Sequence, residues 1–149
     1  MTPLLTRLEA FVAESNHIEG ILRPPTNEEV AALEEFLARP GIKTPDLQQL
    51  VSVFQPDAVL RDRDGLDVRV GDHIAPSGGP RIPEMLDRLL MAIWTGNIEP
   101  WQAHVEYETL HPFTDGNGRS GRALWLWQMR DAPLGFLHTF YYQTLSNSR

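Results

Sequence analysis

The spacing of apolar residues predicts that this chain is mainly α-helical. Apolar side chains recur three and four positions apart between breaks rich in glycine and proline, which is the pattern of helices with one buried face. Thr26 and Glu29 have the spacing of a capping box at a helix start. The expected helices span residues 1–20, 26–39, 45–54, 83–95, 100–110 and 119–130, with one more short helix after Pro133. The helix over residues 83–95 is expected to bury Leu86, Leu89, Leu90, Ile93 and Trp94.

The apolar pattern changes to a period of two within residues 59–74. Apolar residues there alternate with polar ones, as in a strand with one covered face, at Leu66, Val68 and Val70. The pair Asp64-Gly65 is a turn signal. We therefore expect a β-hairpin over about residues 59–74, as the one strand region of the fold. In the simpler interpretation of a plain solvent-facing hairpin, Arg61, Arg63 and Arg69 could be no more than its charged outer face.

Length and composition are those of one globular domain that includes all 149 residues. The chain is 42% hydrophobic and 22% charged, as is usual for a folded protein in water. Its net charge of −7 argues against general adhesion to nucleic acid or to an anionic membrane. An anionic ligand would therefore need a local cationic site. Because cysteine is absent, disulfides and thiolate metal sites are excluded.

The N-terminal segment does not have the pattern of a secretory signal. Arg7, Glu9 and Glu14 interrupt its apolar residues, so no continuous apolar region is present. No apolar run has the length that a membrane span requires. We expect a soluble, cytoplasmic protein without a nucleic-acid or membrane partner, and we leave open whether it forms a homo-oligomer.

The segment HPFTDGNGRSGR, residues 111–122, concentrates unusual residues between two expected helices. Pro112 disfavours continuation of the preceding helix. Gly116 and Gly118 allow the backbone to bend sharply or to approach a ligand closely. The next helix begins near Gly118, where its first N–H groups have no intrahelical partner. A glycine-flanked loop that leads into a helix start is a favourable site for an anion.

The charged residues of this segment indicate which anion the site would take. Arg119 and Arg122 lie near the start of the helix, where cations oppose the helix dipole unless a polyanion lies between them. Asp115 is a single carboxylate, which together with phosphate oxygens and water is a usual way to hold Mg²⁺. His111 has a side chain whose ordinary pKa suits a general base. The residues predict a site for phosphates and Mg²⁺ with a histidine base.

Each of these features also has a simpler interpretation. A glycine-rich turn between helices is often only a turn, and a histidine before a proline is often a surface residue. The features occur together within twelve positions, however, and in an order that would assemble one site. We therefore favour phosphoryl-type transfer from a nucleotide.

The same segment resembles the signature of the Fic (Fido) family, His-Pro-Phe-x-Asp/Glu-Gly-Asn-Gly-Arg-x-x-Arg, at every specified position. The resemblance implies a Fic-type helical bundle with the hairpin as a flap, and AMP transfer from ATP to a protein hydroxyl. By this resemblance His111 would be the base and Asp115 would hold the Mg²⁺ at the α- and β-phosphates. The anion hole would be made by Gly116, Asn117 and Gly118, the outer phosphates would be bound by Arg119 and Arg122, and the loop would be anchored by Phe113.

A second segment, SNHIEG at residues 15–20, ends the first expected helix. Ser15 and Glu19 are four residues apart and share a helix face. The simpler interpretation is a solvated helix end with Gly20 as its cap. The segment also resembles the inhibitory motif of the Fic family, Ser/Thr-x-x-x-Glu-Gly/Asn. By that resemblance Glu19 would pair with Arg122 and prevent productive placement of the γ-phosphate.

Several functions are compatible with these motifs. We favour a protein adenylyltransferase that is inhibited by its own N-terminal helix and that modifies a Tyr, Ser or Thr hydroxyl held by the flap. Alternatives are removal of AMP from a modified protein, another Fic-type phosphoryl transfer, or a non-catalytic module that binds a nucleotide or a partner. The hairpin could also be a plain solvent-facing one. We assign no chemistry to the other histidines, His17, His73, His104 and His138, and expect the tryptophans to pack in the core or at its edge: Trp94, Trp101, Trp125 and Trp127.

Overall fold

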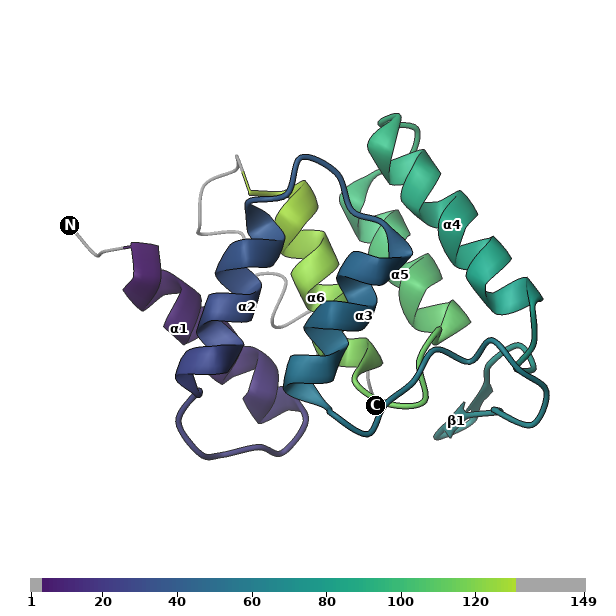
Figure 1. Cartoon of the computed structure of the whole chain (residues 1–149), viewed down its shortest axis with the longest axis horizontal. Coiled ribbons are helices and arrows are strands. Elements are labelled where there is room, and N and C mark those ends of the chain that lie inside the picture. Colours follow the sequence, from purple (N-terminus) through teal and green to yellow (C-terminus); the bar gives the residue numbers. More distant parts are fainter. Residues whose placement is uncertain (1–3, 131–149) are drawn as a thin grey trace.

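A computed structural model describes residues 4–130 of the chain, so the helix expected after Pro133 lies outside the described residues. This part forms a helical bundle with one small antiparallel hairpin (Figure 1). The helices are α1 (Leu4–Ile18), α2 (Asn27–Leu37), α3 (Thr44–Phe54), α4 (Arg81–Trp94), α5 (Pro100–Leu110) and α6 (Asn117–Gln128). The strands are β1 (Arg69–Val70) and β2 (His73–Ile74). None of the helices within residues 4–130 combines the length and the apolar character needed to cross a bilayer.

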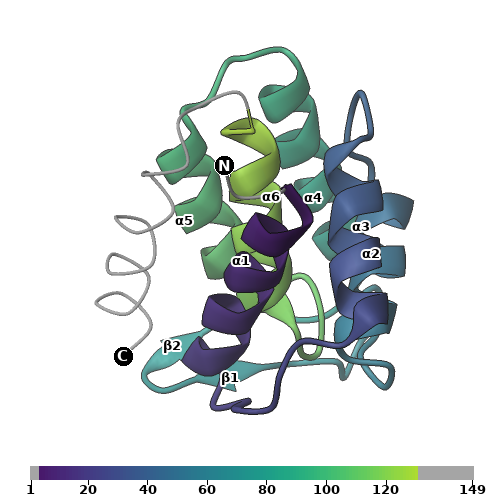
Figure 2. The same ribbon diagram turned by 90° about the vertical axis from the view of Figure 1, so that its left-hand side faces the viewer.

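Helix α6 lies at the centre of the bundle, in contact with α1, α2, α3 and α5 (Figures 1 and 2). Its residues from Arg119 to Trp127 are all buried, as expected of a helix that is surrounded by other helices. The first half of α6 is polar and the second half is apolar. The helix therefore supplies buried polar groups at one end of the bundle and core packing at the other.

Most helix boundaries follow from local sequence signals. The capping box before α2 is confirmed: Thr26 Oγ1 accepts from the N–H of Glu29 at 3.1 Å, and Glu29 Oε1 accepts from the N–H of Thr26 at 2.8 Å. Two helices begin two residues earlier than expected, α4 at Arg81 and α6 at Asn117. In α6 the extra residues belong to the glycine loop, whose backbone already turns into the helix.

The core is built from the apolar faces that the periodicity indicates, and Trp94 is the exception. Leu86, Leu89, Leu90 and Ile93 of α4 are buried as expected, whereas Trp94 is 62% exposed. The Trp94 ring covers Gly41, where a Cβ atom would lie 2.9 Å from its carbon atoms. Trp94 is the last residue of α4, and so its ring packs against a loop instead of entering the core.

The hairpin is shorter than expected and turns at a different place. Its strands pair Arg69 with Ile74 and Val70 with His73, which leaves Gly71-Asp72 as the turn instead of Asp64-Gly65. Gly71 has a φ of 58°, and a glycine with positive φ at the first position suits a two-residue hairpin turn. Asp64-Gly65 forms a separate turn before β1. Near the start of the predicted hairpin, Leu60 pairs with Phe113 of the signature segment.

Candidate active site

The turn between α5 and α6 carries most of the predicted site residues. His111 caps the end of α5 with a φ of 49°, and among the described residues it is the only non-glycine residue with a positive φ. This left-handed conformation costs a residue with a Cβ atom on the order of 1–3 kcal/mol. Contacts around the turn must therefore hold His111 in place.

Phe113 and Asn117 lock the turn from inside. The Phe113 side chain is 1% exposed and lies in the core, as expected of an anchor. The Asn117 amide closes a ring with the Phe113 backbone: its Oδ1 accepts from the N–H at 2.9 Å and its Nδ2 donates to the carbonyl at 2.8 Å. The Asn117 side chain thus shapes the loop, and only its backbone N–H is left to contribute to an anion hole.

The start of α6 forms a site for an anion, and a carboxylate lies against it. Ser120 is the first residue whose N–H bonds back to the loop, at 3.0 Å from the Gly116 carbonyl. The backbone N–H groups of α6 that precede Ser120 have no intrahelical acceptor. The Glu19 carboxylate lies so close that a Cβ atom on Gly118 would be 2.5 Å from Glu19 Oε2. Glycine is required at position 118 for an anion to approach the helix start this closely.

Glu19 and Ser15 both bind Arg122, although 103 residues separate Glu19 from Arg122. The Arg122 guanidinium donates to Glu19 Oε2 at 2.6 Å, to Ser15 Oγ at 2.8 Å and to the Ser15 carbonyl at 3.0 Å. Arg122 is 2% exposed, whereas the Glu19 side chain is 38% exposed, so that water reaches the carboxylate side of this ion pair. The two sequence segments singled out above therefore meet in one site.

Arg119 makes different contacts from Arg122. Its guanidinium donates to Gln55 Oε1 at 2.9 Å and lies over the Phe54 ring at 5.5 Å, so that it faces the end of α3. Within the described chain, Nε and Nη1 of Arg119 are buried and have no hydrogen-bond partner. Arg122 lines the pocket described below and Arg119 does not.

The hydrogen bonds of His111 define its protonation state. Its Nδ1 bonds to the Glu108 carbonyl, which can only accept, so that Nδ1 carries the proton and Nε2 keeps a lone pair. Burial is the main cause that lowers the pKa of His111, and nearby His73 and Arg61 lower it further. The bond to the Glu108 carbonyl and the charge of Glu19 act in the opposite direction. Nε2 of His111 is therefore suited to accept a proton near neutral pH.

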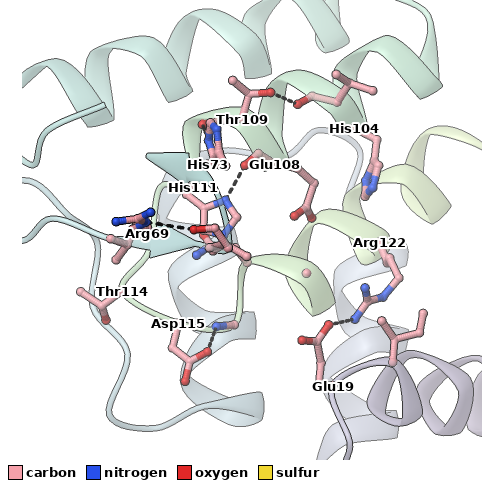
Figure 3. Close-up of a pocket in the computed structure, with 18 of the residues that line it drawn as sticks. Glu19, Arg69, His73, His104, Glu108, Thr109, His111, Thr114, Asp115 and Arg122 are labelled. Atoms are coloured by element: carbon pink, nitrogen blue, oxygen red, sulfur yellow. Dashed lines mark hydrogen bonds and ion pairs between the residues drawn. The ribbon is translucent and has the colours of Figure 1, made fainter. Parts of the chain in front are cut away.

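A pocket of about 1080 Å³ contains most of the predicted residues (Figure 3). It is lined by Glu19, His111, Asp115, Gly116, Asn117, Gly118 and Arg122, and by residues of the hairpin and of α5. Asp115 is exposed, and its Oδ1 accepts from the N–H of Gly116 at 2.8 Å. No group of three or more metal-ligating side chains occurs in the part of the chain that the structure describes. A metal here would depend on Asp115 together with oxygen atoms of its substrate and water.

The hairpin forms one wall of this pocket, and one of the three arginines considered for its outer face is buried. Residues 68–73 line the pocket, from the strand that leads into the turn to His73 of β2. Arg63 and Arg69 are exposed, and Arg69 also lines the pocket. Arg61 is instead 0% exposed and donates to backbone carbonyls. Its charge suggested a solvated position, and only the packing of the loop onto α5 buries it.

Sequence patterns did not identify three other side chains of the pocket. His73 bonds through Nε2 to the Thr109 carbonyl at 2.9 Å, and its ring centre is 6.1 Å from that of His111. Burial raises the pKa of Glu108 to about 8, with a further increase from Glu19 and opposition from Arg122. Burial lowers the pKa of His104 to about 4. An isolated histidine, or a glutamate within a helix, forms no sequence pattern from which its place in a pocket could be predicted.

The described chain is a helical domain in which His111, the start of α6 and the hairpin surround one pocket. The family model of the Fic/DOC family matches residues 48–129, which is more than half of the chain. The chain belongs to this family. No curated protein and no solved structure matches it. Helix α1, with Ser15 and Glu19, lies outside the matched residues.

Proposed function

We propose that this protein transfers AMP from Mg-ATP to a hydroxyl side chain of a target protein, and that Glu19 inhibits it. The observation that carries the proposal is the position of the Glu19 carboxylate, which lies at the start of α6 and binds Arg122 at 2.6 Å. A phosphate of a nucleotide would need the same N–H groups and the same guanidinium. The resting protein therefore holds its own anion where a substrate anion would bind.

His111 would take the proton of the attacking hydroxyl. The hydroxyl oxygen forms a bond to the α-phosphorus, the bond from that phosphorus to the bridging oxygen breaks, and pyrophosphate leaves. The proton goes to Nε2 of His111, whose other nitrogen is held by the Glu108 carbonyl. A base in one fixed orientation contributes about 10²–10⁴ in rate and little binding energy.

Asp115 fits the role of a magnesium ligand. Its Oδ1 is engaged by the Gly116 N–H at 2.8 Å, and its exposed position at the pocket leaves the other carboxylate oxygen accessible. Mg²⁺ commonly takes only one or two protein carboxylates and completes its shell with phosphates and water. Bound there, the ion would neutralise phosphate charge.

The hairpin would hold the target segment in an extended form. Val70 and Ile74 of the hairpin are 47% and 71% exposed. Each strand is only two residues long. A short strand can pair with an added strand through its unused backbone groups. Such pairing would place a Tyr, Ser or Thr hydroxyl in the pocket beside His111.

The test compares wild type with Glu19→Gly, Arg122→Ala and the double variant, each incubated with α-labelled Mg-ATP. We expect wild type to label itself slowly and Glu19→Gly to label itself about tenfold faster or more, because Arg122 is then free to orient the triphosphate. Arg122→Ala loses the phosphate ligand as well as the inhibitory contact, and so it should label poorly. The double variant should resemble Arg122→Ala, since the two residues act on each other.

Controls separate the possible reactions. His111→Ala in the Glu19→Gly protein should abolish labelling and leave the affinity for ATP within a few-fold. Incorporation of a γ-label instead of an α-label would identify phosphate transfer, and ATP binding without any label transfer would identify a binding module. Loss of label from a previously modified protein on addition of wild type would identify AMP removal. If Glu19→Gly labels no faster than wild type in a His111-dependent reaction, Glu19 is not inhibitory.

A further inference from the structure

Arg61 is the most completely buried charged side chain of the loop that leads into the hairpin. It is 0% exposed, and its hydrogen bonds go to four backbone carbonyl oxygens. Burial lowers the pKa of Arg61, and the charge of Asp67 opposes this effect. Burying a guanidinium is costly unless its donors are satisfied. Its four acceptors therefore explain why Arg61 is tolerated in the interior.

Two of these acceptors belong to the turn between α5 and α6 that carries His111, which is called the catalytic turn below. Nε of Arg61 donates to the His111 carbonyl at 2.6 Å, and Nη2 donates to the Leu110 carbonyl at 2.8 Å. Carbonyls at the end of a helix have no intrahelical donor. The Arg61 backbone also donates to the Pro112 carbonyl at 2.9 Å. Arg61 thus binds three successive carbonyls of the turn that keeps His111 in its left-handed conformation.

The other two acceptors belong to the base of the flap. Nη1 of Arg61 donates to the Leu66 carbonyl, which precedes β1, at 3.0 Å, and to the Pro76 carbonyl, which follows β2, at 2.8 Å. The two sides of this base are close-packed, because a Cβ atom on Gly78 would lie 2.6 Å from the Leu66 carbonyl oxygen. One guanidinium therefore holds both ends of the flap and the turn that carries His111.

We propose that Arg61 is a positioning residue of the transfer reaction, which fixes the base of the flap and the catalytic turn to each other and so keeps Nε2 of His111 in one orientation toward the flap. This inference rests on the proposed function. Arg61 does not line the pocket and contacts neither a nucleotide site nor Arg122. It acts through the backbone on either side of Pro112.

The geometry predicts that lysine cannot replace this arginine. A lysine ammonium is a point charge with three donors, whereas the planar guanidinium reaches acceptors on several sides at once. Arg61→Lys should retain the positive charge near His111 but lose most of the four hydrogen bonds. Arg61→Met, which has similar length, should lose both the charge and the hydrogen bonds.

The test uses Arg61→Lys and Arg61→Met in the Glu19→Gly protein, with Leu33→Ala as a control. Leu33 is 1% exposed in α2 and contributes to the core away from the pocket, so it reports the effect of lost stability alone. Calorimetry measures the affinity for Mg-ATP, and α-labelled ATP measures the rate of self-labelling by the folded protein. We expect both Arg61 variants to label at least about tenfold more slowly than the control, with affinity for ATP within about threefold. Labelling as fast as that of the control, or affinity that falls as much as the rate, would overturn the proposal.

A second measurement does not depend on any transfer. Nitrogen NMR of the imidazoles should show His111 protonated at Nδ1 in the parent protein and in Leu33→Ala. Both Arg61 variants should show a mixture of the two neutral forms, and Arg61→Met should also show a higher pKa for His111 because a nearby positive charge is gone. If Arg61→Met does not fold, the proportion of the two neutral His111 tautomers in Arg61→Lys alone tests the proposal. Unchanged His111 signals would overturn the role of Arg61, whereas a Glu19→Gly protein that transfers nothing would refute the proposed function and leave this measurement valid.

Discussion

At the scale of single residues, the burial of ionisable groups determines the character of the pocket. Arg122 is 2% exposed, and its partners Glu19 and Ser15 come from α1. Glu108 faces the same pocket between His111 and Arg122 in the view of Figure 3. Within the described chain its Oε1 is buried and has no hydrogen-bond partner. An ionised carboxylate in such a place is costly, which is why burial raises the pKa of Glu108 to about 8.

Glu108→Gln should therefore change how stability depends on pH. Between the ordinary pKa of 4.5 and about 8, the folded protein keeps a proton on Glu108 that the unfolded chain has lost. The contribution of this carboxyl to the free energy of unfolding is fully present below about pH 4.5. It falls by up to about 1.4 kcal/mol per pH unit and is lost as pH rises through about 8. Glutamine does not titrate. Relative to wild type, the variant should gain stability from pH 5 to pH 8.5, as measured by urea unfolding at both values.

The matched control for this prediction is Glu106→Gln on the exposed part of the same helix. It should change stability by nearly equal amounts at both pH values. Parallel pH dependences for wild type and Glu108→Gln would show that Glu108 is ionised in the folded protein.

At the scale of elements, the approach of α5 to α6 sets the distance between His111 and Arg122. Helix α5 leads into His111, and α6 carries Arg122. They meet closely at Gly121, where a Cβ atom would lie 2.5 Å from Glu108 Oε1 and 3.0 Å from Tyr107 Cδ1. Tyr107 Oη bonds to Ser120 Oγ at 2.7 Å in the same contact.

Gly121→Ala should force these helices apart. Alanine normally stabilises a helix interior by about 0.5–1 kcal/mol relative to glycine. Here the added methyl group overpacks a tight contact, so we expect a net loss of about 1–3 kcal/mol in the free energy of unfolding. Urea unfolding measures it, with Ser52→Ala on the exposed face of α3 as the control for helix propensity. A Gly121→Ala protein as stable as that control would mean that the two helices separate without cost.

At the scale of the whole molecule, the packing of α1 determines whether Glu19 stays at the site. The side chains Leu8, Phe11 and Val12 are buried against the rest of the bundle, and α1 contacts both α2 and α6. Figure 2 shows α1 running along α6 toward the hairpin. The free energy that holds α1 in place therefore also holds the Glu19 carboxylate beside Arg122.

Phe11→Ala should activate the protein in part. Truncation of a buried phenylalanine costs about 3–5 kcal/mol, and here the loss falls on the contact between α1 and the bundle. We expect faster self-labelling than in wild type, less than in Glu19→Gly, together with faster hydrogen exchange in residues 4–18. Phe11→Ala added to Glu19→Gly should give no further increase in rate. An increase of equal size in both backgrounds would mean that α1 does not act through Glu19.

Local signals in the sequence predicted most of the elements and the turn between α5 and α6. Apolar periodicity, the capping box at Thr26 and the proline and glycine breaks depend on contacts within a few residues, and these contacts form in almost any fold. The signature segment is also local, since its loop is closed by Asn117 and Phe113, only four residues apart. The meeting of Glu19 with Arg122 was predicted by family resemblance, because no local pattern relates residues 103 positions apart.

Tertiary structure alone decided which charged and aromatic groups are buried. Arg61 and Arg63 are alike in sequence context, yet the first is enclosed by four carbonyls and the second is exposed. The positions of Trp94, Glu108 and the hairpin turn also depend on which segment packs against each of them. Burial and the pKa that follows from it are properties of the surroundings in space. A one-dimensional pattern reports only the neighbours along the chain.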